Sequence, residues 1–223
     1  MNSYDFLKYL TVNLNAKKIS VDNQHICAAT GFYAIINNTP VIVTAKHFTS
    51  NTETAITISA HYKENNTIIT LPVTANIEWF CSDEYDIAYC KVQPIAKKFK
   101  EITGKDMFYT AISEKYIITK DDFSKLNILS EVLAIGYPKG VSSTHHEFPL
   151  LKKGYISSLP SDFTEDGEGY LDLCAEEGYS GSPIFLNNSQ LKLVGILVKG
   201  ISGTPNSTTI YISADKILDI NTD

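Results

Sequence analysis

A serine between two glycines is the part of this sequence whose residue types best suit covalent chemistry. It is Ser180, in the run Gly178–Pro183 with the sequence GYSGSP. Glycines let a backbone turn tightly and bring its N–H groups close to a ligand, and proline ends the turn by fixing its own φ. A serine held in such a turn presents its Oγ beside amides that can stabilise an oxyanion, as acyl transfer requires. Taken singly, Ser180 is equally well a turn serine, so the prediction depends on a base and an acid elsewhere.

A histidine and an aspartate upstream complete a candidate set. His47 closes the β-branched run Val41–His47, which predicts a buried strand that delivers the imidazole at its end. Asp86 directly precedes a short apolar run, where a partly buried carboxylate can hold an imidazole in one tautomer. Asp83 and Glu84 are competing acids, and Asp86 is preferred because it adjoins the apolar run. Singly, His47 is equally a hydrogen-bonded histidine at a sheet rim, and Asp86 an ordinary acid at a strand edge.

The order of these residues separates two classes of serine hydrolase. An α/β-hydrolase has its histidine after the nucleophile, and a glycine two positions beyond that serine. Here Ser182 stands at that position and no histidine follows, so this class is excluded. All the histidines precede Ser180, namely His25, His47, His61, His145 and His146.

Together the segments resemble the chymotrypsin-like (trypsin-fold) serine proteases over roughly residues 25 to 213. Two further stretches are similar to the bacterial high-temperature-requirement and glutamyl-endopeptidase branches, and a third resembles the strand that walls the primary specificity pocket. The motifs that carry the resemblance are Thr44–His47, Asp86–Ala88, Ala134–Gly140, Gly154–Ser158, Gly178–Pro183 and Leu193–Val198. The resemblance implies an all-β fold of two six-stranded antiparallel β-barrels. It also implies a protease domain without a further regulatory domain.

The residue pattern agrees with an all-β chain that has short helices at its two ends. The length of 223 residues, with 13 Tyr and 10 Phe, suits two small barrels of half-buried strands. Helical pattern is predicted at Tyr4–Leu10 and Ala214–Ile220, and Pro94–Leu129 is predicted to connect the barrels, with a short helix. We predict one unit over residues 1–110, with His47 and Asp86, and a second over residues 111–223, with Ser180. Three hairpins are predicted, at Gly31–Thr44, Ala55–Val73 and Ile184–Val198.

The resemblance also assigns roles. It implies that His47 is the general base, that Asp86 orients it, and that Ser180 attacks a peptide carbonyl to form an acyl-enzyme. The backbone N–H groups of Gly178 and Ser180 would form the oxyanion hole. The implied substrate-binding residues are Cys174, Val198, Lys199, Gly200 and Thr209.

Departures from the family bear on activation and specificity. Tyr179 stands where pancreatic-type relatives have an aspartate that pairs with a new N-terminal amine. The loop must therefore be ordered by internal contacts, by a partner or by substrate. Cys174 replaces the aspartate that selects Lys or Arg, and Leu197 replaces the histidine of glutamyl-specific relatives. With β-branched Thr209 narrowing the pocket, we expect cleavage after a small or medium uncharged residue.

Charge and composition exclude several function classes. The net charge of −6 disfavours nucleic acid as a partner. No apolar run is long enough to span a membrane, and no leader is apparent, so a cytoplasmic location with reduced cysteines is expected. His145 and His146 are adjacent and would point to opposite faces of an extended chain, which does not predict a metal pair. A loop at a barrel mouth is predicted for them, and no cofactor is expected.

Several charged residues near the serine have two interpretations. Glu176 and Glu177 either attract basic residues of a substrate or are ordinary solvated loop acids, and the second interpretation is preferred. Lys152 and Lys153 are predicted to be solvated surface.

The expected partners are a protein or peptide substrate and a regulatory partner that restrains the enzyme. A silent trypsin-fold module that grips peptides, and an esterase with the same acyl chemistry, are the alternatives.

Overall fold

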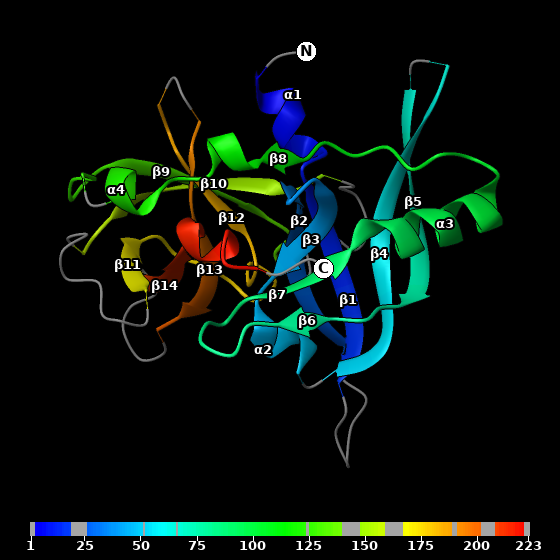
Figure 1. Cartoon of the computed structure of the whole chain (residues 1–223), viewed down its shortest axis with the longest axis horizontal. Helices are drawn as coiled ribbons and strands as arrows, with labels where there is room; N and C mark the ends of the chain where they lie inside the picture. The colour runs from blue at the N-terminus through cyan, green and yellow to red at the C-terminus, as the bar shows by residue number, and fades with distance from the viewer. Residues whose placement is uncertain are drawn as a thin grey trace.

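The chain forms two β-rich halves that lie side by side (Figure 1). The computed structural model describes residues 3–18, 26–50, 52–65, 67–123, 125–139, 148–158, 167–188, 191–201 and 208–220. The elements of the first half and of the connection are α1 (Ser3–Lys8), β1 (Thr11–Lys18), β2 (Ile26–Ile36), β3 (Thr39–Thr44), α2 (Lys46–Thr49), β4 (Thr52–Glu64), β5 (Thr67–Asn76), β6 (Phe80–Cys81), β7 (Ala88–Lys91), α3 (Val92–Thr103), β8 (Ile112–Ser113), η1 (Glu114–Tyr116) and α4 (Lys120–Phe123). The elements of the second half are β9 (Glu131–Gly136), β10 (Leu150–Ile156), β11 (Glu168–Asp172), β12 (Pro183–Leu186), β13 (Leu193–Gly200), β14 (Thr208–Ser213) and the 3₁₀ turn η3 (Ala214–Ile217).

The second half is a closed barrel of six antiparallel strands, in the order β10-β11-β14-β13-β12-β9. This confirms the predicted all-β, chymotrypsin-like fold and the predicted second barrel. The first half differs from the prediction of six strands in a closed barrel. It is an eight-stranded sheet in the order β5-β4-β1-β2-β3-β7-β6, with β8 beside β2. Its path stays open, since the strands at its two ends, β5 and β6, do not pair with each other.

The predicted division at residue 110 stays a prediction. Residues 112 and 113 of β8 pair with β2, so the first sheet takes a strand from beyond that position. The predicted C-terminal helix is the short 3₁₀ turn η3, and the predicted helix in the connection is α3.

Local chemistry accounts for the hairpins and for the end of α3. Asn37 and Asn38 join β2 to β3 with φ of 48° and 61°, a left-handed conformation that asparagine tolerates in two-residue hairpin turns. Pro94 lies in the first turn of α3, where its missing N–H leaves no intrahelical bond unmade. Gly104 ends the helix with φ of 69°. The three predicted hairpins are confirmed as β2–β3, β4–β5 and β12–β13.

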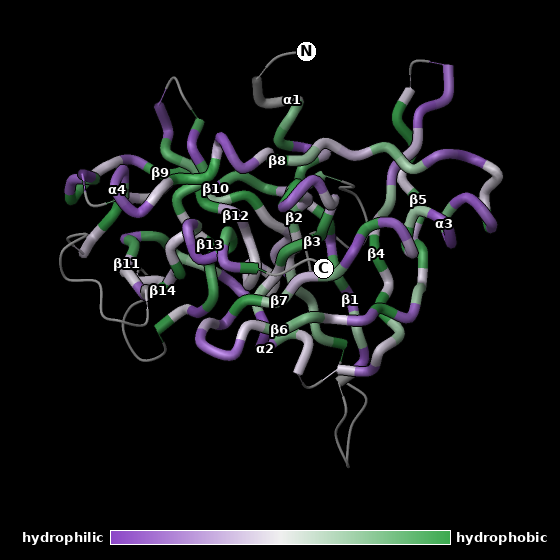
Figure 2. Tube along the Cα trace, in the orientation of Figure 1, coloured by the Kyte–Doolittle hydropathy of each residue, from purple (hydrophilic) through white to green (hydrophobic). Residues whose placement is uncertain are grey.

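An apolar core runs through the junction of the two halves. One cluster of buried side chains joins Phe32 and Val43 of the first sheet to Ile135, Phe185 and other residues of the barrel. Figure 2 shows the hydrophobic stretches concentrated in the strands, and hydrophilic stretches at α3 and the outer end of the β4–β5 hairpin. Within the described residues, no helix is both long and apolar enough to cross a bilayer. The shared core holds the two halves in one fixed relation.

Candidate active site

The sheet register brings His47 and Asp86 together. β3 and β7 are antiparallel neighbours with Thr44 opposite Ala88, so residues just after β3 lie beside residues just before β7. The strand predicted to reach His47 ends at Thr44, and His47 lies on the short helix α2. The predicted position of Asp86, directly before a buried strand, is confirmed.

Asp86 contacts His47 through both carboxylate oxygens. Its Oδ2 lies 2.7 Å from the imidazole Nδ1, and its Oδ1 accepts the His47 backbone N–H at 2.8 Å. The Asp86 side chain is 31% exposed. Burial on its own raises the pKa of this carboxyl, but the hydrogen bonds and charge of His47 prevail and hold the pKa below its usual value. The carboxylate therefore stays ionised and fixes the direction of the ring.

Ser180 faces the other nitrogen of the same ring. Its Oγ lies 3.1 Å from His47 Nε2, and 3.3 Å from the carbonyl oxygen of Val198, to which it can also donate. Two backbone bonds hold this serine between the halves. The Thr30 N–H donates to the Ser180 carbonyl at 2.8 Å, and the Gly181 N–H donates to the Leu197 carbonyl at 2.7 Å. The structure thus brings together all three residues predicted for catalysis, in one hydrogen-bonded chain.

The two predicted oxyanion amides have no partner within the described fold. Neither the Gly178 N–H nor the Ser180 N–H has a hydrogen-bond acceptor among the described residues. The carbonyl of Glu177 accepts the Lys139 N–H at 2.7 Å. Because a trans peptide points its C=O and N–H in opposite directions, the Gly178 N–H is turned away from Lys139.

Glycine is required at position 178. Its φ is +101°, and an added Cβ would lie 2.2 Å from the carbonyl oxygen of Tyr137.

Thr30 of β2 is a site residue that the sequence analysis missed. Its fully buried hydroxyl donates to the Gly178 carbonyl at 2.8 Å and accepts the Tyr137 N–H at 2.9 Å. One side chain of the first sheet therefore ties two segments of the second half that flank the oxyanion amides. Thr30 lies in an ordinary strand-like run, and only its long-range partners distinguish it from other strand threonines.

Some of the five predicted substrate-binding residues lie close together. Gly200 of β13 pairs with Thr209 of β14, and the buried Thr209 hydroxyl donates to the Leu173 carbonyl, next to Cys174. Cys174 is exposed near the start of the loop of residues 173–182 that carries Ser180. Val198 is buried with its carbonyl toward Ser180, and Lys199 is exposed at the same strand end.

The charged residues before the serine are paired internally. Glu177 Oε1 forms an ion pair with Lys139 Nζ at 2.6 Å, and Glu176 Oε1 forms one with Lys152 Nζ at 2.7 Å. The predicted solvated role is thus wrong for Lys152, which is 24% exposed. It holds for Lys153, the next residue of the strand, whose side chain is 54% exposed. The glutamate side chains are 56% and 62% exposed, which agrees with the preferred interpretation of both as solvated loop acids.

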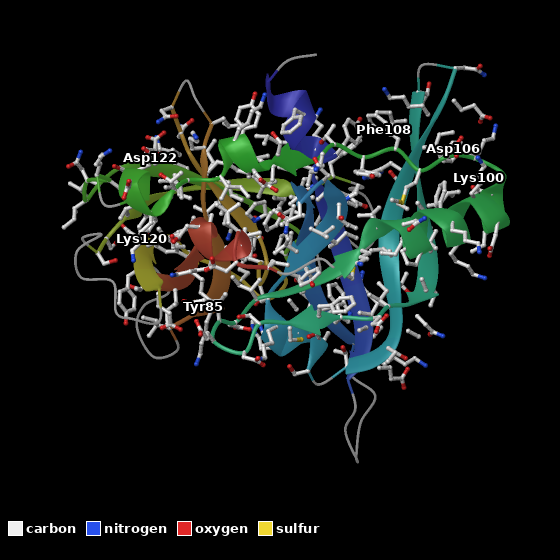
Figure 3. All side chains as sticks on the ribbon, in the orientation of Figure 1. Tyr85, Lys100, Asp106, Phe108, Lys120 and Asp122 are labelled. Carbon is white, nitrogen blue, oxygen red and sulfur yellow. The ribbon has the colours of Figure 1, made fainter. Side chains whose placement is uncertain are left out.

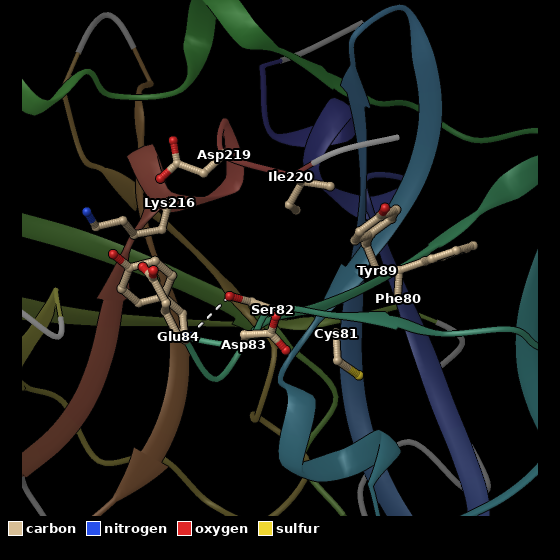
Figure 4. A pocket seen from close by; sticks show the side chains of 10 residues that line it. Phe80, Cys81, Ser82, Asp83, Glu84, Tyr89, Lys216, Asp219 and Ile220 are labelled. Carbon is tan, nitrogen blue, oxygen red and sulfur yellow. Dashed lines mark hydrogen bonds between the residues drawn. The ribbon is translucent and has the colours of Figure 1, made fainter. Parts of the chain in front are cut away.

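A cavity of about 590 Å³ adjoins the segment before Asp86 (Figure 4). The stacked rings of Phe80 and Tyr89 line it, as do Lys216 and Asp219 from the C-terminal end. Tyr85 lies below η3 with the Lys216 ammonium 5.0 Å from its ring (Figure 3). None of the three hydrogen-bonded residues lines this cavity, so it is separate from the candidate centre.

The other histidines do not join the site. His61 is buried in β4, with its Nδ1 2.8 Å from the Thr70 hydroxyl. The predictions for His145 and His146 lie outside the described residues, as does His25. In the described part of the chain, no group of three or more His, Cys, Asp or Glu side chains could hold a metal ion.

The site and fold agree with comparisons against known proteins. The profile of the trypsin-like peptidase domain family matches residues 29–196. The chain belongs to the trypsin-like peptidase family. A comparison with curated proteins gives no match.

Solved structures extend the likeness of this trypsin-like peptidase to nearly its whole length. The HtrA-type protease AlgW with a tripeptide is 17% identical with a TM-score of 0.63, and the match covers 98% of this chain and 61% of that one. A serine endoprotease from Yersinia pestis is 18% identical with a TM-score of 0.59, covering 99% and 65%. The MamO protease domain from Magnetospirillum magneticum is 16% identical with a TM-score of 0.58, covering 99% and 100%.

The TM-scores of these three structures show a shared fold. The chain spans less than two thirds of the first two structures and the full length of the isolated MamO domain.

Proposed function

We propose that this trypsin-like peptidase is a serine endopeptidase that hydrolyses protein or peptide substrates through Asp86, His47 and Ser180. The observation that carries the proposal is the hydrogen-bonded chain from the Asp86 carboxylate through both ring nitrogens to the Ser180 hydroxyl. Two backbone amides in the same turn, those of Gly178 and Ser180, have no acceptor among the described residues.

The first half-reaction forms an ester. As the Ser180 Oγ attacks the carbonyl carbon, its proton passes to His47 Nε2, and Asp86 stabilises the imidazolium through Nδ1–H. The carbonyl electron pair moves to oxygen, and the N–H groups of Gly178 and Ser180 bind that oxyanion. His47 then gives its proton to the leaving amine as the C–N bond breaks.

The second half-reaction consumes water. His47 takes a proton from the water that attacks the acyl ester, the same amides bind the second oxyanion, and the proton returns to Ser180 Oγ as the acid leaves. Both half-reactions balance in protons and charge with these side chains and water alone.

For specificity, we propose cleavage after a small or medium uncharged residue, such as Ala, Val, Thr or Leu. Support comes from Thr209, whose buried side chain bonds the Leu173 carbonyl beside Cys174. A β-branched side chain at that place leaves less depth than glycine would. A peptide library read by mass spectrometry tests this, because dominance of Arg, Lys or Glu before the cut would contradict it.

A fluorophosphonate probe tests the catalytic proposal directly, since it reacts with an activated serine whatever the natural substrate. The expected result is labelling of the wild type and none of Ser180→Ala, with Ser182→Ala as a nearby serine control that retains labelling. Proteome-wide mapping of new N-termini, with wild type against Ser180→Ala, then separates an endopeptidase from an esterase. A wild type that folds but never labels would favour the silent peptide-binding module.

A further inference from the structure

We propose that Lys152 is a positioning residue that holds the nucleophile loop, residues 173–182, in the shape that catalysis needs. The part of this inference that concerns catalysis rests on the proposed function. Loop ordering is a property of the fold and can be measured without activity.

The Lys152 ammonium makes three contacts with the loop. It donates to the Cys174 carbonyl at 2.9 Å and to Glu176 Oε1 at 2.7 Å. It also lies 5.0 Å from the centroid of the Tyr179 ring. A lysine head has three donors and a positive charge that is attracted to an aromatic face, so one side chain satisfies all three contacts.

The position of Lys152 makes these contacts a support for the loop. Lys152 lies within β10 and pairs with Ala134 of β9, so its backbone belongs to the closed barrel. The loop it touches has no strand pairing between the end of β11 at Asp172 and Pro183. A rigid strand thus holds a segment that lacks a sheet ladder of its own.

Tyr179, the residue directly before Ser180, is the aromatic side chain that the Lys152 ammonium contacts. Its side chain has no solvent exposure, and its hydroxyl lies 3.4 Å from the Leu150 carbonyl. Burial raises the pKa of this phenol, so the ring stays neutral and Lys152 meets it through the π face. The Glu176 carboxylate supplies the compensating negative charge. At the sequence position where pancreatic-type relatives are expected to have an aspartate that pairs with a new N-terminal amine, this chain therefore has a tyrosine that meets the Lys152 ammonium.

The opposite side of the loop has a second support. The Lys139 N–H and ammonium bind the carbonyl and carboxylate of Glu177, at 2.7 Å and 2.6 Å. Glu176 is thus held by a lysine within β10, and Glu177 by a lysine that follows β9. The Glu177–Gly178 peptide that comes next keeps the orientation that frees the Gly178 N–H. Removing the Lys152 support releases Cys174, Glu176 and Tyr179 together.

The test compares Lys152→Met, which keeps an apolar stem but loses the charge, with Lys153→Met. Lys153 is the adjacent residue of β10, but it pairs with Glu131 and does not touch the loop. Amide hydrogen exchange of residues 174–182 is expected to be at least about ten-fold faster in Lys152→Met, and unchanged in Lys153→Met. Lys152→Arg, which restores the charge, is expected to regain most of the protection.

The second measurement is the rate of fluorophosphonate labelling. Displacing one oxyanion donor costs on the order of 10²–10³ in rate, so Lys152→Met is expected to label about 10²-fold more slowly while it remains folded. The proposal is overturned if the loop amides of Lys152→Met exchange at the wild-type rate. It is also overturned if Lys153→Met slows labelling as much as Lys152→Met does. If the wild type itself fails to label, the proposed function is wrong, and the exchange experiment still decides the role of Lys152.

Discussion

Replacing Asp86 by Asn tests the orienting role of the carboxylate without removing its shape. The amide oxygen can still accept the His47 backbone N–H, which Asp86 Oδ1 accepts at 2.8 Å. The amide NH₂ then occupies the place of Oδ2, 2.7 Å from Nδ1. Two N–H groups cannot face each other at that distance, so the ring must lose its Nδ1 proton and carry the proton on Nε2. In that tautomer His47 cannot accept the proton of Ser180.

The size of the effect follows from this change of tautomer. A carboxylate-to-amide change at the orienting acid of a serine–histidine–acid set lowers turnover by on the order of 10⁴. This corresponds to about 5 kcal/mol of transition-state stabilisation. The fold should persist, because the backbone contact to His47 is kept.

The assay is the second-order rate of fluorophosphonate labelling at neutral pH, with thermal unfolding as a check on folding. Asp83→Asn is the matched control, since Asp83 lies in the same loop, is exposed and makes no contact with His47. We expect Asp86→Asn to label at least 10³-fold more slowly, and Asp83→Asn at the wild-type rate. A folded Asp86→Asn protein that labels within ten-fold of wild type would refute the assignment of Asp86.

Three further predictions concern the supports of the site. Gly178→Ala places a Cβ 2.2 Å from the Tyr137 carbonyl oxygen at φ +101°, so the rate of fluorophosphonate labelling should fall by at least about 10²-fold. Gly104→Ala is the control: its φ is +69° and nothing lies within 4 Å of the added Cβ, so it should cost only about 1–2 kcal/mol of stability and leave labelling intact. Thr30→Val leaves two buried backbone groups unpaired and should lower the free energy of unfolding by about 1–3 kcal/mol in urea titrations, whereas Thr30→Ser should be close to wild type. Because the pKa of Asp86 is lowered in the folded state, its ionisation stabilises the fold above the unfolded-state pKa of about 3.9. The stability advantage of wild type over Asp86→Asn should therefore shrink as pH falls through that value, and vanish below the folded-state pKa.

The three residues proposed for catalysis could be predicted from local sequence, because His47 follows an apolar run, Asp86 precedes one, and Ser180 lies between two glycines. Apolar runs become strands, and the end of a strand presents a side chain at a sheet rim. The register of β3 against β7 then brings His47 to Asp86 without any further information. The closed second barrel followed from the resemblance.

The supports of the loop could not be predicted, because their partners are distant in the chain. Thr30 is bonded to Gly178 across 148 positions, and no local pattern marks that threonine. Lys152 and Lys153 look alike in sequence, yet alternation along a strand turns one toward the loop and the other toward Glu131. The open first sheet could not be predicted either, since no local pattern shows whether the strands at the two ends of a sheet pair with each other.

The division of the site between the two halves constrains how activity can be controlled. The first sheet supplies His47, Asp86 and Thr30, and the second half supplies Ser180 and the Gly178 and Ser180 amides. A shift of about 1 Å between the halves would break a 3.1 Å contact and lose about 10²-fold in rate. Such a shift is opposed by the apolar cluster that crosses the junction, because close-packed cores do not deform gradually. The loop of residues 173–182 has no sheet ladder and depends on a few polar contacts, so a regulator could change its shape at far smaller free-energy cost. Any partner that restrains this peptidase is therefore expected to act on the loop supports, not on the packing of the halves.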